Sequence, residues 1–251
     1  MRIILAFLVA AGAWAQQPPH EPAVVGRLRA ALDGISHTIN DFGDTRRYAP
    51  DNETVPPPAP GEERVVFLGD SITDFWGRRG SPFFPGKPYI NRGISGQVTP
   101  QMLVRFYPDV VALRPKAVVI LAGTNDIGGN IGPLPVEASE NSLMSMADLA
   151  RANNIKVILS SLLPVSDYHP RPNQPPQTQT RPPEKILALN RWLRDYAAKN
   201  QFVYVDYFSA MVDDKGLFRA ELTDDGLHPN AAGYEVMAPL AAKAIAAALA
   251  R

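Results

Sequence analysis

The strongest constraint on the fold is a pattern that begins at Arg64, where short apolar runs alternate with longer stretches of helical periodicity. The runs are rich in β-branched and aromatic residues, and they are continuous, which is typical of strands covered by helices on both faces. Such an alternation predicts an α/β fold in which a parallel sheet lies between two layers of helices. The predicted strands are 65–68, 117–121, 155–159 and 202–205.

Helical patterns fill the intervals between these strands. The first begins at Thr99-Pro100, a capping residue followed by a proline at the first helical position. In a parallel sheet, function gathers at the carboxyl ends of the strands, so the polar residues that follow each strand are the candidates for a site. The predicted helices are 99–113, 136–152, 183–200 and 230 to the alanine-rich C-terminal end.

The first 15 residues have the pattern of a signal peptide. Met1 and Arg2 give a short positive start, residues 3–13 are apolar or small, and Ala13-Trp14-Ala15 is a small-x-small cleavage site. The apolar run is well short of the roughly 20 residues that span a bilayer, which favours cleavage over a retained anchor. We therefore expect an exported protein, periplasmic or extracellular, with no stable membrane insertion after cleavage.

Residues 16–61 precede the strand-and-helix pattern. A polar tether at 16–22 leads into apolar residues at helical spacing between Val24 and Phe42, and a proline-rich stretch at 56–61 follows. We expect 16–61 to form a tether and an amphipathic helix packed on a main domain at 62–251.

Composition and charge exclude several classes of function. The chain has 25 Lys+Arg and 25 Asp+Glu, so its formal net charge of zero gives no global field to attract nucleic acid. It contains no cysteine, which excludes disulfides, a thiol nucleophile, thiolate metal sites and lipid attachment at the cleavage point.

A serine stands at the end of the first predicted strand. In Gly69-Asp70-Ser71, the glycine allows a bend and Ser71 lies two residues beyond the strand, where its hydroxyl can project into a cleft. A helix N-cap is the alternative role for Ser71, because serine is a common capping residue.

Two further stretches could stabilise an anion formed beside that serine. Asn125, in Gly123-Thr124-Asn125-Asp126 after the strand at 117–121, could supply a side-chain amide donor, and Gly93 in Asn91-Arg92-Gly93 could present a backbone N–H. Turn residues that satisfy their own loop backbone are the alternative in both places.

A serine nucleophile needs a base, and the histidines provide one candidate. Of the four histidines, only His228 lies in a compact polar turn with a carboxylate nearby, since Asp225 precedes it by three residues. Asp225 can orient the imidazole and stabilise its protonated form. Both residues could instead cap the last helix.

Other polar and aromatic residues flank these stretches. We expect Asp70, Asp74 and Asp126 to act first as capping groups, with a cation site as an alternative. The proline-rich loop from Pro164 to Pro183 is a candidate wall of the substrate cleft. Aromatic residues after the serine could form an acyl pocket or belong to the core: Phe75, Trp76, Phe83 and Phe84.

These stretches resemble the four blocks of the GDSL/SGNH hydrolase superfamily, in the family's order. The matches are Gly-Asp-Ser-Ile-Thr with Ser71, Asn-Arg-Gly-Ile-Ser-Gly with Gly93, Gly-Thr-Asn-Asp with Asn125, and Asp-Gly-Leu-His-Pro with Asp225 and His228. Ile72 stands where the eponymous motif has leucine. The chain looks most like secreted bacterial acylhydrolases of the platelet-activating-factor acetylhydrolase-like type.

The resemblance implies a flavodoxin-like α/β/α sandwich and a serine esterase that needs no metal or organic cofactor. It implies a catalytic triad of Ser71, His228 and Asp225 and an oxyanion hole made by Ser71, Gly93 and Asn125. The substrate would be a small-molecule, glycan or lipid ester. The acyl group, the alcohol and the oligomeric state stay open.

Three alternatives share these residues or this fold. An O-acyltransferase would use the same triad with a sugar hydroxyl in place of water. A non-catalytic carbohydrate-binding or cell-envelope module would keep the fold without needing the complete residue set. A metal-dependent hydrolase would use the aspartates and His228, but a single histidine makes a thin ligand set.

Overall fold

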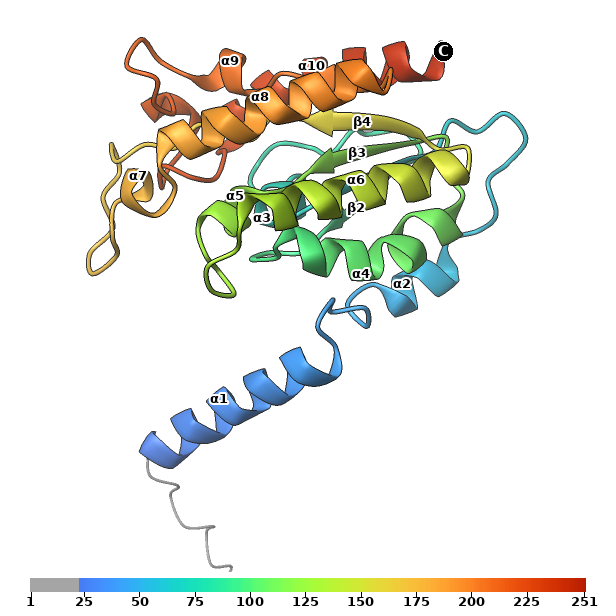
Figure 1. The fold of residues 1–251 in the computed structure, drawn as a ribbon. Helices are drawn as coiled ribbons and strands as arrows, with labels where there is room; N and C mark the ends of the chain where they lie inside the picture. Colours follow the sequence, from blue (N-terminus) through green and yellow to red (C-terminus); the bar gives the residue numbers. More distant parts are fainter. Residues whose placement is uncertain (1–22) are drawn as a thin grey trace, which may run out of the picture. The chain divides into compact units, whose positions relative to one another are not determined.

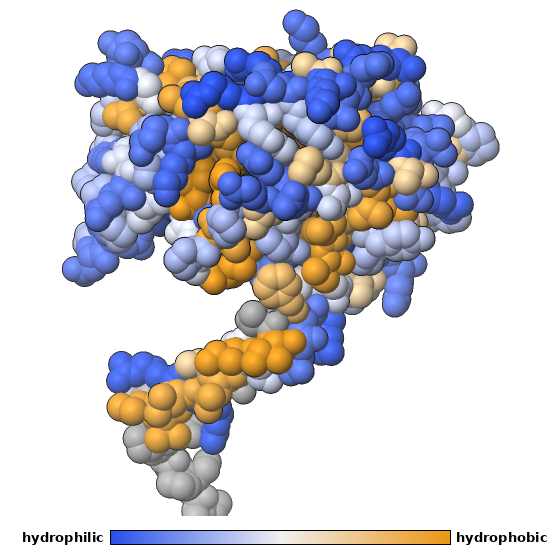
Figure 2. All heavy atoms as spheres, viewed as in Figure 1, coloured by the Kyte–Doolittle hydropathy of each residue, from blue (hydrophilic) through white to orange (hydrophobic). Residues whose placement is uncertain are grey.

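The computed structural model describes residues 23–251 and divides them into two units, which end and begin at Asn40 and Asp41. The predicted signal peptide lies outside the described residues. The first unit is helix α1 (Ala23–Asn40), which matches the helical pattern seen in the sequence. Its apolar side chains, among them Leu28, Leu32 and Ile39, are exposed and form an apolar band along the helix (Figure 2).

The second unit is built on a five-stranded parallel sheet (Figure 1). The strands run in the order β2-β1-β3-β4-β5, the doubly wound order of flavodoxin-like folds. The predicted three-layer α/β fold is therefore confirmed. Their bounds are β1 Val65–Gly69, β2 Tyr89–Gly93, β3 Ala117–Leu121, β4 Lys156–Ser160 and β5 Val203–Val205.

The helices follow the predicted positions closely. The four long ones are α4 (Thr99–Asp109), α6 (Val136–Ala152), α8 (Pro183–Lys199) and α10 (Ala231–Leu249). The shorter ones are α2 Ala49–Thr54, α3 Ser71–Asp74, α5 Thr124–Ile127, α7 Gln177–Thr180 and α9 Phe208–Met211, with 3₁₀ turns η1 Val111–Leu113 and η2 Ala220–Leu222.

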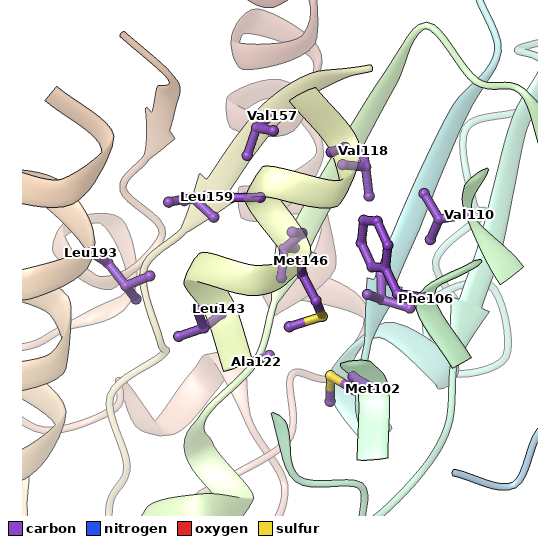
Figure 3. Packing of buried hydrophobic residues seen from close by; sticks show 14 of the residues in the cluster. Met102, Phe106, Val110, Val118, Ala122, Leu143, Met146, Val157, Leu159 and Leu193 are labelled. Carbon is purple, nitrogen blue, oxygen red and sulfur yellow. The ribbon is translucent and has the colours of Figure 1, made fainter. Parts of the chain in front are cut away.

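Alternate residues of each strand point to opposite faces, and each face has its own core. On one face, Val118 and Leu159 pack with residues of α4, α6 and α8, including Phe106, Met146 and Leu193 (Figure 3). On the other face, residues of α3, α9 and α10 pack against the intervening strand positions. The continuous apolar strands are explained by this two-sided burial.

Helix α10 is long and apolar enough to cross a membrane by length and composition. Its apolar character has another explanation in this fold, because Tyr234, Met237, Ala241 and Ile245 are buried in the core against the sheet. The helix is therefore an element of the core.

Strand β2 was not expected from the sequence. Its residues include Asn91 and Arg92, which do not form a continuous apolar run, and the sequence suggested a loop here. The strand lies at the edge of the sheet, and within residues 23–251 its one partner strand is β1, so it is less buried than the central strands and accommodates polar residues. The Arg92 side chain donates to Asn52 Oδ1 at 2.9 Å.

Residues 41–61 belong to the same unit as the sheet, although the sequence suggested a boundary near residue 61. The Tyr48 hydroxyl is buried and donates to Gly93 O at 2.5 Å. Asn52 Nδ2 donates to Asp109 Oδ1 at 2.7 Å. Residues 41–61 are thus attached to the edge strand β2 and to helix α4.

Candidate active site

Ser71 lies where the sequence predicted, at the carboxyl end of β1. It is the first residue of the short helix α3, and Asp70 caps that helix by accepting a hydrogen bond from the Ile72 N–H at 2.9 Å. Ser71 is therefore not the N-cap, which answers the alternative raised by the sequence. Its side chain is free to face the turn that precedes α10.

Ser71, His228 and Asp225 form one chain of hydrogen bonds. Ser71 Oγ lies 2.9 Å from His228 Nε2, and His228 Nδ1 lies 2.7 Å from Asp225 Oδ2. With the Nδ1 proton directed at the carboxylate, Nε2 is left to accept from the serine hydroxyl. Ser71 and His228, which are 157 positions apart in the sequence, thus meet beyond the carboxyl end of β1.

The carboxylate of Asp225 is held in its charged form. Burial favours the neutral acid, but hydrogen bonds from the His228 ring and from the backbone N–H groups of His228 and Leu227 outweigh it. Together they lower the pKa of Asp225 well below its usual range. A cation also contacts Asp225 Oδ2, since Arg171 donates to it from the loop at 164–183.

Asn125 lies at the end of β3, on the neighbouring strand. It is the second residue of α5 and is almost fully buried, with 3% of its surface exposed. Its Nδ2 donates to Gln97 O at 3.0 Å, and its Oδ1 accepts from Arg181 Nη2 at 3.2 Å. Strands β1 and β3 flank the point where the strand order reverses, which is where doubly wound sheets bind ligands.

Gly93 is engaged differently from the expectation. Its N–H donates to Asn91 Oδ1 at 2.9 Å, so that donor is already used. A Cβ atom at Gly93 would lie 2.1 Å from Asp74 N, which means that α3 packs directly on this glycine. A glycine is needed at position 93 because α3, the helix that carries Ser71, packs too closely on it for any side chain.

Three residues further on, Gly96 has the properties expected of a backbone donor. It is exposed, it has a φ of +83°, and its N–H has no hydrogen-bond partner in the part of the chain that the structure describes. Gly96 could have been considered from the sequence, since it is the second glycine of the Asn91–Gly96 stretch that contains Gly93.

Of the flanking aspartates, Asp70 caps α3 and Asp126 accepts hydrogen bonds at the start of α4, as expected, whereas Asp74 is the last residue of α3 and caps no helix in the described chain. Asp126 accepts from the Thr99 hydroxyl at 2.5 Å, at the start of α4, and from the Ser139 hydroxyl at 2.8 Å in α6. Asp74 accepts from the Ser95 hydroxyl at 2.6 Å. Within residues 23–251, no group of three or more His, Asp or Glu side chains is arranged to hold a metal ion.

The aromatic residues after the serine divide between site and core. Phe75 faces the site, with its ring centroid 5.1 Å from that of His228. Trp76, Phe83 and Phe84 instead pack with Phe67 of β1. The sequence-based acyl pocket is therefore reduced to Phe75.

Comparison with known proteins agrees with this geometry. Residues 67–236 match the model of the GDSL-like Lipase/Acylhydrolase family. The chain belongs to this family. As a GDSL protein it is a carboxylic ester hydrolase. The similar proteins described next are named as an acylhydrolase, a lipase and an esterase.

Two solved structures are similar over most of the chain. A putative acylhydrolase from Bacteroides fragilis is 41% identical, with a TM-score of 0.76, and the match covers 83% of this chain and 99% of that one. A GDSL-like lipase from Bacteroides thetaiotaomicron is 40% identical, with a TM-score of 0.75, over 82% of this chain and 99% of that one. Acetylxylan esterase from Geobacillus stearothermophilus is 24% identical over 70% of this chain and 90% of its own length.

Proposed function

We propose that this GDSL hydrolase cleaves a carboxylic ester through an acyl-enzyme on Ser71, with His228 as general base and Asp225 as its orienting carboxylate. The hydrogen-bonded chain of Ser71 Oγ, the His228 ring and Asp225, with distances of 2.9 and 2.7 Å, is the observation that supports this most strongly. A serine hydroxyl is a weak nucleophile until such a base takes its proton.

In the first half of the reaction, Ser71 Oγ attacks the ester carbonyl carbon while its proton passes to His228 Nε2. The tetrahedral intermediate collapses when His228 gives that proton to the leaving alcohol oxygen and the ester C–O bond breaks. In the second half, water attacks the acyl-enzyme and gives a proton to His228. The carboxylic acid leaves as Ser71 recovers its proton.

The oxyanion of each tetrahedral intermediate needs preorganised donors. We assign this role to the backbone N–H of Ser71 and the side-chain amide of Asn125. For the third donor, Gly96 replaces Gly93, because the Gly93 N–H already donates to Asn91 Oδ1 and the Gly96 N–H has no such partner in the described chain.

A serine-directed fluorophosphonate probe tests the nucleophile. We expect labelling of the wild type at Ser71, found by peptide mapping, and no labelling of Ser71→Ala or His228→Ala. Ser209→Ala is the matched control, because the hydroxyl of this exposed serine on α9 donates to Asp206 and, among the described residues, has no histidine partner. A folded wild type that neither labels nor cleaves p-nitrophenyl acetate contradicts the proposal.

The substrate is proposed to be a small-molecule or glycan ester. One relative is named for deacetylating xylan, which supports a glycan ester with a short acyl group. A largely apolar groove of about 650 Å³ runs beside α5, which carries Asn125, and it is lined by Ile127, Leu134 and Ala188 among others. We propose that this groove receives a longer acyl chain, because its lining residues Asp126 and Ile127 follow Asn125 directly in α5.

Filling the groove tests that assignment. Ala188 is exposed on α8, so Ala188→Trp should place an indole in the groove without disturbing the core. We expect hydrolysis of p-nitrophenyl octanoate to fall about tenfold and hydrolysis of the acetate to stay unchanged, which serves as the internal control. An equal loss on both esters would remove the groove from the substrate site.

We also propose that the protein is exported by cleavage after Ala15. The support is the sequence pattern of residues 1–15. Mass spectrometry of the protein recovered from outside the cytoplasm should give an N-terminus at Gln16, and an N-terminus at Met1 in that fraction contradicts the proposal.

A further inference from the structure

Arg181 reaches Asn125 from the proline-rich loop between β4 and α8. It is 8% exposed, and its Nη2 donates to Asn125 Oδ1 at 3.2 Å. A buried guanidinium is costly to desolvate, and burial accordingly lowers the pKa of Arg181. A charge buried beside a candidate oxyanion donor calls for a function.

The contact fixes which way the amide of Asn125 faces. Arg181 occupies the carbonyl end of the amide, and Gln97 O accepts from its nitrogen end at 3.0 Å. A flipped amide would turn its NH₂ toward a cation and its oxygen toward a carbonyl, and both contacts would repel. The observed orientation leaves the second N–H of Nδ2 for a ligand, and the adjacent cation polarises that N–H as a donor.

The loop also holds Arg181 in place. Arg181 Nη1 donates to Gln177 Oε1 at 3.0 Å and to Thr180 Oγ1 at 3.2 Å, both in the short helix α7. On its other side the guanidinium lies against Gly128, where a Cβ atom would come within 2.8 Å of Nη2. A residue with a side chain at position 128 would push the guanidinium away.

We propose that Arg181 is a positioning residue that locks the Asn125 amide in its donor orientation for the oxyanion. This inference rests on the proposed function. It makes the loop at 164–183 a support of the catalytic machinery, beyond any role as a wall of the cleft.

A double-mutant cycle tests it, with kcat and KM measured on p-nitrophenyl acetate. Arg181→Met should lower kcat about tenfold or more with KM nearly unchanged, because the amide that it positions stabilises the transition state. Since Arg181 and Asn125 are in direct contact, the effects of the two substitutions should not add. In the Asn125→Ala background the same substitution should cost nothing further. Arg181→Lys should recover part of the loss, and Arg151→Met, an exposed arginine paired with Asp148 on α6, should behave as wild type.

A second variant keeps the test valid if Arg181→Met folds poorly. Gly128→Ala retains the arginine, and the backbone at position 128 has an ordinary helical φ of −69°. The three atoms nearest to the new Cβ all belong to the Arg181 guanidinium, so this group is the one that must move. It should reproduce the loss in kcat and its dependence on Asn125. Fluorophosphonate labelling of Ser71 reports on the nucleophile in each variant.

Losses from Arg181→Met and Asn125→Ala that multiply, with Ser71 still labelled, would overturn this inference and leave the proposed function standing. A wild type that is not labelled, or whose turnover is unaffected by Ser71→Ala, would overturn both.

Discussion

Asp70 and Asp225 are both buried beside the serine helix, and their surroundings shift their pKa values in opposite directions. Burial raises the pKa of Asp70 to about 7, because desolvation outweighs the hydrogen bond from the Ile72 N–H and the attraction to Arg181, and its Oδ2 has no hydrogen-bond partner in the described chain. Asp225 is also desolvated, but the bonds from His228 and Leu227 keep it ionised. One carboxyl supports a helix, and the other faces the base.

The pKa of Asp70 predicts a pH dependence of stability. Below the unfolded pKa near 3.9 the group is neutral in both states and contributes nothing. Between there and about 7 the folded state keeps a proton that the unfolded state loses, so rising pH destabilises the fold by at most about 1.4 kcal/mol per pH unit. Above about 7 the cost stays constant.

Asp70→Asn removes this titration and keeps an oxygen for the Ile72 N–H. In urea denaturation at several values between pH 4 and pH 8.5, the free energy of unfolding of the variant relative to wild type should increase up to about pH 7 and then level off. The other titrating groups are shared by both proteins, so the difference isolates Asp70. Curves that stay parallel across this range would contradict the assignment.

The sequence indicated most of the candidate site at this scale. Ser71, Asn125, Asp225 and His228 were found because each follows a predicted strand or precedes the last helix in a polar cluster. Arg181 was missed because a single arginine among prolines has no motif, and its role appears only when the loop folds back on α5. Gly93 and Gly96 could not be separated, since the choice depends on which N–H is already bonded.

At the scale of the elements, the contact between β2 and α3 determines where Ser71 lies. Gly93 lets the backbone of α3 approach the edge strand, and Asn91 Nδ2 ties the two together by donating to Thr73 O at 2.6 Å. The long elements were predictable from caps and apolar periodicity. Strand β2 was not, because an edge strand with polar residues lacks the continuous apolar run on which the prediction depended.

Two alanine substitutions separate the roles of the two glycines. Gly93→Ala should destabilise the fold by roughly 1–3 kcal/mol or more and abolish activity, because the new Cβ meets the backbone of Asp74 at 2.1 Å. Gly96→Ala should lower the free energy of unfolding by only about 1–2 kcal/mol, the strain of placing alanine at a positive φ. The new Cβ clashes with nothing, because the nearest atom to it is Asn130 Nδ2 at 3.9 Å.

Thermal unfolding and esterase assays on both variants provide the measurement. We expect Gly96→Ala to stay folded and to keep activity within about tenfold of wild type, since its N–H is retained. If the Gly93→Ala protein has normal stability and has lost only its activity, the result would support Gly93 as an oxyanion donor and contradict this assignment.

At the scale of the whole molecule, the boundary of the compact unit lies at residue 41. We predict that a chain beginning at Asp41 keeps the Tm and the esterase activity of the longer chain. A chain beginning at Glu62 should have a clearly lower Tm, because it loses the bonds of Tyr48 to Gly93 and of Asn52 to Asp109. Equal Tm values for these two chains would contradict this boundary.

The proposed nucleophile and its base come from opposite ends of the sheet-forming unit, with Ser71 after its first strand and His228 just before its last helix. The serine is therefore without its base until the final helix has docked. During synthesis, most of the chain emerges from the ribosome as an inactive protein. With the proposed triad, hydrolysis requires that β1 and the turn before α10 be in place together, so esterase activity reports on the docking of the two ends of this unit.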